Sequence, residues 1–246
     1  MDMYWTAMSY AALPAVGNLV GGGIAELVRI PPAMLGFALH FAAGTILAVV
    51  GIELMATALQ TAHPATIALA FVAGGAAAAW LESAIDFVAR RFGGSAGGAG
   101  PWMINAGVAV DLISDGVMIG TSASISGKLA LLLALGQVAA DIPEGFATIA
   151  TFRKEGMGRA ARLALTASFA LPVLAATTLG YFSVRGSPPV VKFALLSFTA
   201  GMLTTIAVEE MIEEAHATGR ERESGWQTLG LAVGFAAFIM ISAGLG

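Results

Sequence analysis

The sequence contains no cysteine and few charged residues. The absence of cysteine excludes disulfides, thiolate metal ligands and thiol redox chemistry. Charged residues make up 11% of the chain, whereas a soluble domain carries about 25%. No basic stripe suggests nucleic-acid binding. Too few polar residues remain to cover the surface of a soluble protein of this size.

Apolar residues dominate instead, at 57% of the 246 positions, and the mean hydropathy is +0.82. The 31 glycines suit close packing between helices in lipid. The N-terminus has no basic n-region and no clear cleavage site, so we interpret it as the first span. The composition predicts an integral membrane protein with one transmembrane domain over residues 1–246.

Membrane-spanning helices need about 20 consecutive, mostly apolar residues. The sequence contains eight such stretches, separated by short segments rich in glycine, proline or charge. We therefore expect an all-α protein with eight transmembrane helices, over residues 4–28, 33–59, 64–89, 102–126, 129–151, 160–183, 189–214 and 225–245.

Basic residues are distributed unevenly between the two sides of this arrangement. Loops after the first, third, fifth and seventh spans carry nine Lys or Arg residues, and the opposite side carries three. Cytoplasmic loops carry the excess of positive charge. Both termini are therefore expected outside the cytoplasm, in what we expect to be a bacterial inner membrane.

The second and seventh spans share a pattern of phenylalanine, two small residues and glycine, followed nine residues later by glutamate. The glycines are Gly44 and Gly201, and the glutamates are Glu53 and Glu210. The second copy lies five spans after the first, so the two cross the membrane in opposite directions. The pattern predicts an inverted repeat of helices 1–3 and 6–8 around helices 4 and 5, as in many secondary transporters.

The fourth and fifth spans also resemble each other. Asp-Leu-Ile-Ser-Asp-Gly of the fourth aligns with Ala-Asp-Ile-Pro-Glu-Gly of the fifth. Within each motif the two acids are three or four residues apart and share one helix face. At about 1.5 Å per residue, all four acids are expected near mid-membrane. They are Asp111, Asp115, Asp141 and Glu144.

Four acids at one depth have three explanations. They bind a divalent cation, they relay protons, or they are protonated and hydrogen-bond neighbouring helices. Pro143 lies between two of the acids and removes a helix hydrogen bond, which frees the Ala139 carbonyl four residues earlier. Negative charge beside a free carbonyl oxygen favours the cation.

The Ile-Pro-Glu-Gly core, the paired acid-glycine motifs, the eight spans and the outward termini resemble the ZIP (Zrt/Irt-like) metal transporters. The Phe-Ala-Ala-Gly pattern with Glu-Leu-Met after it resembles the bacterial branch of that family. The resemblance covers nearly the whole chain and implies a metal site on the fourth and fifth helices. Asp115, Asp141 and Glu144 match family ligands, and Asp111 stands where the family has histidine.

Three positions depart from the family pattern. Leu112 replaces an asparagine, Ala140 a histidine or glutamine, and Leu171 the glutamate before Pro172. These losses predict one metal ion in place of two, or a relative whose transport function has drifted. The remaining donors are all oxygen, which suits Mn²⁺, Mg²⁺ or Ca²⁺ better than Zn²⁺, whereas the resemblance implies zinc or iron.

The sequence thus predicts a divalent metal cation transporter that moves zinc, iron or manganese toward the cytoplasm. Glu53 and Glu210 either line its pathway or gate, or hydrogen-bond near a helix end. The alternative is a proton-coupled solute transporter, or a non-transporting relative that binds no metal. We expect no enzymatic role, because no nucleophile–base set stands out. The resemblance is compatible with a homodimer.

Overall fold

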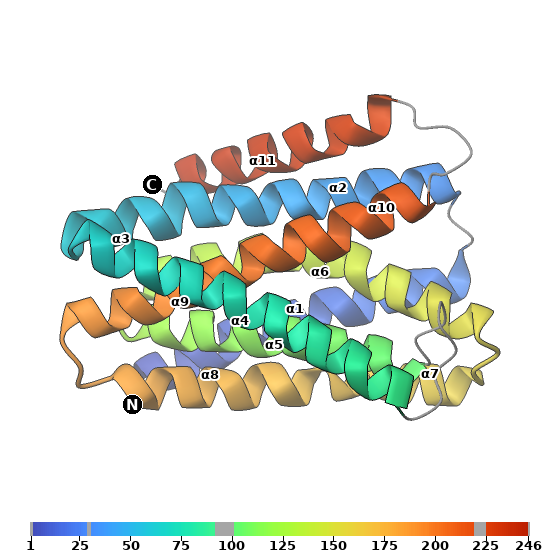
Figure 1. Cartoon of the computed structure of the whole chain (residues 1–246), viewed down its shortest axis with the longest axis horizontal. Coiled ribbons are helices and arrows are strands. Elements are labelled where there is room, and N and C mark those ends of the chain that lie inside the picture. The colour runs from blue at the N-terminus through green and yellow to red at the C-terminus, as the bar shows by residue number, and fades with distance from the viewer. Residues whose placement is uncertain (1, 29–30, 92–100, 219–224, 246) are drawn as a thin grey trace.

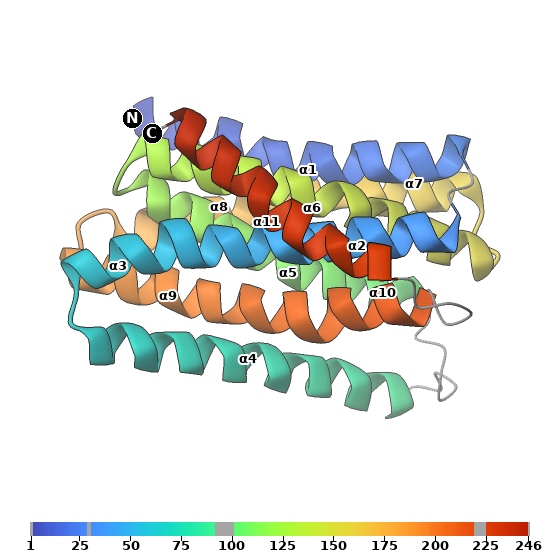
Figure 2. The same cartoon turned by 90° about the horizontal axis from the view of Figure 1, so that it is seen from above.

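A computed structural model describes residues 2–28, 31–91, 101–218 and 225–245. Every regular element among these residues is a helix. The helices run along one long axis, and α1 begins at the same end of the bundle at which α11 finishes (Figures 1 and 2). The all-α prediction is confirmed.

The helices lie within a few residues of the predicted bounds. In chain order they are α1 (Asp2–Leu27), α2 (Pro32–Ala48), η1 (Val49–Met55), α3 (Ala56–Thr61), α4 (Pro64–Arg91), α5 (Pro101–Ala123), α6 (Gly127–Lys154), α7 (Arg159–Ser168), α8 (Ala170–Val184), α9 (Pro189–Ile206), η2 (Ala207–Met211), α10 (Ile212–Thr218) and α11 (Gly225–Leu245), where η marks a π-helix.

Three predicted helices are divided into shorter pieces. π-helical segments separate α2 from α3 and α9 from α10. The predicted helix over 160–183 divides at Phe169 into α7 and α8. Pro172 has no N–H to offer the Ser168 carbonyl, which explains a break at this point. At the break, the Phe169 amide donates to the Thr166 carbonyl instead, at 3.2 Å.

Six helical segments of the described chain are long and apolar enough to cross a membrane. This finding indicates an integral membrane protein. α1 and α5 are not among the six, although both run the length of the bundle (Figures 1 and 2). These two helices carry polar side chains into its interior, including Asn18 on α1 and Asp111 and Asp115 on α5.

Four pairs of helices pack most closely. They are α1 with α6, α2 with α11, α4 with α9, and α5 with α8. Buried apolar side chains of α2, α6, α9 and α11 form the largest core cluster, which includes Ile46, Leu133, Leu203 and Phe238. α4 lies at the outside of the bundle (Figure 2), and most of its residues are not buried. α6 therefore lies inside the bundle, between α1, α2 and α5.

Candidate metal centre

The antiparallel packing of α5 and α6 brings their acidic motifs together. α5 ends at Ala123 and α6 begins at Gly127, so a tight turn joins the two helices. Ser126 caps α6, and its side chain accepts from the Leu129 amide. Ser, with its short polar side chain, is a preferred residue at this position. The turn fixes the register in which the two motifs face each other.

Three of the four predicted acids form a compact cluster. One carboxylate oxygen from each of Asp111, Asp141 and Glu144 lies within 4.8 Å of the others. Asp111 and Asp141 are only 3% and 1% exposed, and Glu144 is half-buried. Three oxygens at this spacing, from two helices, can ligate one divalent cation together.

Asp115 lies one turn along α5 and has a different environment. It is completely buried, and its Oδ1 accepts from the side-chain amide of Gln137 on α6. Its carboxylate is not part of the three-oxygen cluster. The structure thus unites three of the predicted ligands and gives the fourth an amide partner.

A second amide reaches the cluster from α1. Asn18 Nδ2 donates to Asp141 Oδ1 at 3.1 Å, and Asn18 is completely buried. Its position depends on Gly145, the residue after Glu144, because a Cβ there would lie 2.2 Å from the Asn18 carbonyl oxygen. The glycine lets α1 approach α6 closely enough for the amide to reach the acid.

Sequence reasoning missed both amides. Gln137 lies four residues before Asp141 and so shares its helix face. Asn18 is a polar residue in an apolar helix, next to a glycine. Both were detectable as polar residues inside predicted spans, but only the structure shows which acids they contact.

Several oxygen atoms of the cluster have no hydrogen-bond partner among the described residues. They include Asp111 Oδ1 and Asp141 Oδ2, together with the amide oxygens of Asn18 and Gln137. A buried polar atom without a partner costs about 1–3 kcal/mol, and more if it is charged. These oxygens are all acceptors, so a cation would satisfy them.

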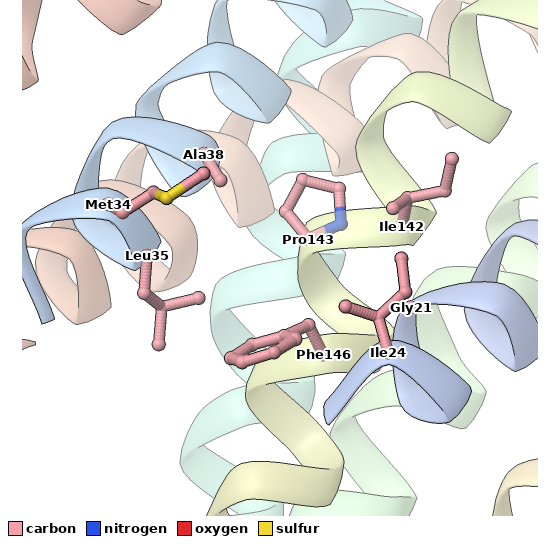
Figure 3. Close-up of a pocket in the computed structure, with 8 residues that line it drawn as sticks. All are labelled: Gly21, Ile24, Met34, Leu35, Ala38, Ile142, Pro143 and Phe146. Atoms are coloured by element: carbon pink, nitrogen blue, oxygen red, sulfur yellow. The ribbon is translucent and has the colours of Figure 1, made fainter. Parts of the chain in front are cut away.

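α6 continues as a helix through Pro143. The proline has no N–H, so the Ala139 carbonyl lacks its usual partner within the helix. An apolar cleft of about 380 Å³ lies beside the proline, between α1, α2 and α6 (Figure 3). Its lining contains no acid and consists of Gly21, Ile24, Met34, Leu35, Ala38, Ile142, Pro143 and Phe146. One side of α6 therefore borders an apolar cleft next to the carboxylate cluster.

The three departures from the family pattern add no ligand. Leu112 is fully buried in an apolar cluster with Phe169 and Val173, and Ala140 belongs to the main core. Leu171 is 71% exposed. Apolar packing and exposure replace the polar groups that a second metal position would need.

The predicted gate residues lie at the two π-helical segments. Glu53 lies in η1 and accepts from the Ser242 hydroxyl of α11. Glu210 lies in η2, and its side chain is outside the described part of the chain. π-helical segments occur often at functional sites. Among the described side chains, Glu53 is not grouped with the carboxylate cluster.

The fold and site define a class: a helical integral membrane protein with a buried, all-oxygen carboxylate cluster. Comparison with known protein families and with curated protein sequences gives no match.

Proposed function

We propose that the chain is a divalent metal cation transporter of the ZIP-like kind. The observation that carries this proposal is the carboxylate cluster of Asp111, Asp141 and Glu144. Three acids close together in the membrane interior are costly unless they are neutralised, ligated or hydrated. A divalent cation offsets their mutual repulsion and gives a partner to Asp111 Oδ1 and Asp141 Oδ2, which have none among the described residues.

The donor set favours hard or intermediate cations. Carboxylate and amide oxygens are the ligands of Mn²⁺, Mg²⁺ and Ca²⁺, and Fe²⁺ is intermediate. Zinc prefers nitrogen and sulfur, but the family resemblance keeps it among the candidates. We propose one ion at this site, with the Asn18 amide orienting Asp141 and the Gln137 amide holding Asp115 outside the cluster.

Eight transmembrane helices in an inverted repeat are part of this proposal. In that plan, α1, α2–α3 and α4 correspond to α7–α8, α9–α10 and α11, and α5 corresponds to α6. The packing of α1 on α6 then matches that of α8 on α5. The packing of α11 on α2 matches that of α4 on α9. The four closest helix pairs therefore support the repeat.

The matched glycines support the same plan. A Cβ at Gly44 would lie 2.0 Å from the Leu231 carbonyl oxygen of α11. A Cβ at Gly201 would lie 2.0 Å from the Phe71 carbonyl oxygen of α4. Each glycine thus permits the same close approach to the corresponding helix, and each is followed by a π-helical segment that contains the matched glutamate.

Transport follows from alternating exposure of the cluster. The cation exchanges hydration water for carboxylate oxygens, and the two repeats shift against the site helices until it opens on the other side. The excess of Lys and Arg in one set of loops supports termini outside the cytoplasm, and we propose uptake toward the cytoplasm. We further propose that the protein is a homodimer in a bacterial inner membrane.

The test is metal uptake into vesicles of purified protein. Asp141→Asn with Glu144→Gln removes two cluster charges with little change in shape. We expect saturable uptake of Mn²⁺, Fe²⁺ or Zn²⁺ to disappear, while Glu155→Gln, in the exposed turn after α6, leaves it unchanged. Normal uptake in the double variant contradicts the proposal. Proton flux without metal binding would support the proton-coupled alternative.

A further inference from the structure

Two of the three histidines lie side by side, away from the carboxylate cluster. His40 on α2 is 2% exposed, and His216 on α10 is exposed to solvent. Their ring centroids are 5.1 Å apart and their planes are inclined by 73°. α2 begins and α10 ends at the same end of the bundle (Figures 1 and 2).

A backbone contact fixes the tautomer of His40. Its Nδ1 lies 2.8 Å from the Gly36 carbonyl oxygen. A carbonyl oxygen only accepts hydrogen bonds, so Nδ1 carries the proton and Nε2 carries the lone pair. Metal-binding histidines are held in this way, with one nitrogen bonded to a carbonyl and the other facing the ion.

The spacing of the two rings fits a shared metal ion. Zinc–nitrogen bonds of about 2.0–2.1 Å in a tetrahedral arrangement place two imidazole centroids about 5 Å apart. The observed distance of 5.1 Å between the centroids matches this spacing. Because His216 is exposed, water can complete the coordination of the ion.

Apolar residues next to the pair contact α6, the helix that carries Asp141 and Glu144. Leu39 and Ala215, which adjoin the two histidines in sequence, pack against Ala147 of α6. Ala147 is three residues after Glu144, on the side of α6 that leads to the same bundle end as His216. The two groups of donors are therefore joined through the apolar contacts of α2 and α10 with α6.

We propose that His40 and His216 form a second metal site, with imidazole donors and a preference for Zn²⁺, Co²⁺ or Ni²⁺. Its nitrogen ligands suit softer ions than the all-oxygen cluster does. The site goes beyond the proposed transport function and does not depend on it. An ion held there occupies the end of the bundle at which the basic turn between α6 and α7 lies.

The test is Co²⁺ titration of the purified full-length protein, followed by visible absorption. Asp141→Asn with Glu144→Gln serves as the background, so that carboxylate binding does not contribute. We expect one Co²⁺ per chain, with the visible absorption of an ion that is bound by two imidazole nitrogens and water. Adding His216→Ala weakens the affinity at least tenfold. His63→Ala, at the opposite end of the bundle, leaves it unchanged.

A replacement ligand separates coordination from structural damage. The chain has no cysteine, so His216→Cys introduces one thiolate and should restore Co²⁺ binding with a new sulfur-to-metal charge-transfer band. Unchanged affinity in His216→Ala, or loss of binding without rescue by His216→Cys, overturns the second site. The transport proposal is contradicted by a different result, normal uptake in the acid double variant. The two proposals can therefore be tested independently.

Discussion

The two amides at the carboxylate cluster determine which oxygens remain available for a cation. Gln137 donates to Asp115, and Asn18 donates to Asp141. Asp115 thereby gains a neutral partner outside the three-oxygen group, while Asp141 keeps Oδ2 free among the described residues. Asn18 therefore acts on the cation through Asp141, the acid that it orients.

Replacing Asn18 by leucine tests this positioning role. The change removes the donor to Asp141 at similar side-chain size, so the carboxylate loses its fixed orientation. We expect metal affinity to fall about 10–100-fold, the usual effect of removing a partner that orients a ligand. Calorimetric titration of the purified protein with Mn²⁺ measures the change.

Thr177→Val is the matched control, because the buried Thr177 hydroxyl donates only to the Val173 carbonyl of its own helix. Its affinity should equal that of the unaltered chain. Equal affinities in all three proteins would show that Asn18 does not position the cluster.

The sequence predicts the acids well because a charged residue in an apolar run is conspicuous. Asp111, Asp141 and Glu144 were identified by motif and spacing alone. Asn18 was not, because a single amide in a membrane helix is unremarkable until its partner is known. The partner comes from α1 packing on α6, a contact between residues 123 positions apart.

At the scale of helices, a salt bridge joins α1 to α7. Arg162 donates from Nε and Nη2 to the two carboxylate oxygens of Glu26, at 2.6 and 2.9 Å. It also donates to the Met157 carbonyl. Arg153 of α6 donates to the Ala25 carbonyl at 2.8 Å. These bonds join α1, α6 and α7 at one end of the bundle.

Arg162→Met should therefore destabilise the protein. It leaves Glu26 without its two-point partner in a largely buried contact, which costs more than loss of an exposed pair. We expect the midpoint of thermal unfolding in detergent, followed by tryptophan fluorescence, to fall by about 5 °C or more.

Arg159→Met is the control. Arg159 also lies near Glu26, at 3.6 Å, but its side chain is 68% exposed, so its loss should change the midpoint little. Equal midpoints for the two variants would contradict a structural role for the Arg162 contact.

The interruptions of the helices were beyond sequence reasoning. A π-helical segment shifts the hydrogen-bond register by one residue without a proline or other local signal. From its sequence, Val49–Met55 is therefore expected to be ordinary α-helix, and only the structure shows that it is a π-helix. Pro172 is a possible sequence signal for the break at Phe169. Proline is often tolerated inside membrane helices, however, so its presence alone does not predict a break.

For the whole molecule, the proposed repeat makes a quantitative prediction. Gly44→Ala and Gly201→Ala each place a Cβ 2.0 Å from a carbonyl oxygen of the partner helix. Overpacking of this kind costs about 1–3 kcal/mol, so both variants should lose similar stability. Gly23→Ala, where a Cβ meets nothing within 4 Å, should be neutral or stabilising. A large effect at only one of the matched glycines would count against equivalent halves.

The orientation in the membrane can be tested because the chain contains no cysteine. Eight spans with outward termini place the turn after α6 in the cytoplasm and the turn after α8 outside. Glu155 and Gly186 are exposed in these two turns. A membrane-impermeant maleimide applied to intact cells, with the outer membrane made permeable, should label Gly186→Cys and spare Glu155→Cys.

After disruption of the inner membrane, both cysteines should react. Equal labelling of the two positions at that stage shows that protection of Glu155→Cys arises from the bilayer and not from burial in the protein. Labelling of Glu155→Cys alone in intact cells would invert the topology. The loops rich in Lys and Arg would then lie outside the cytoplasm, contrary to the rule that cytoplasmic loops carry the excess of positive charge. The proposed direction of transport toward the cytoplasm would lose its support.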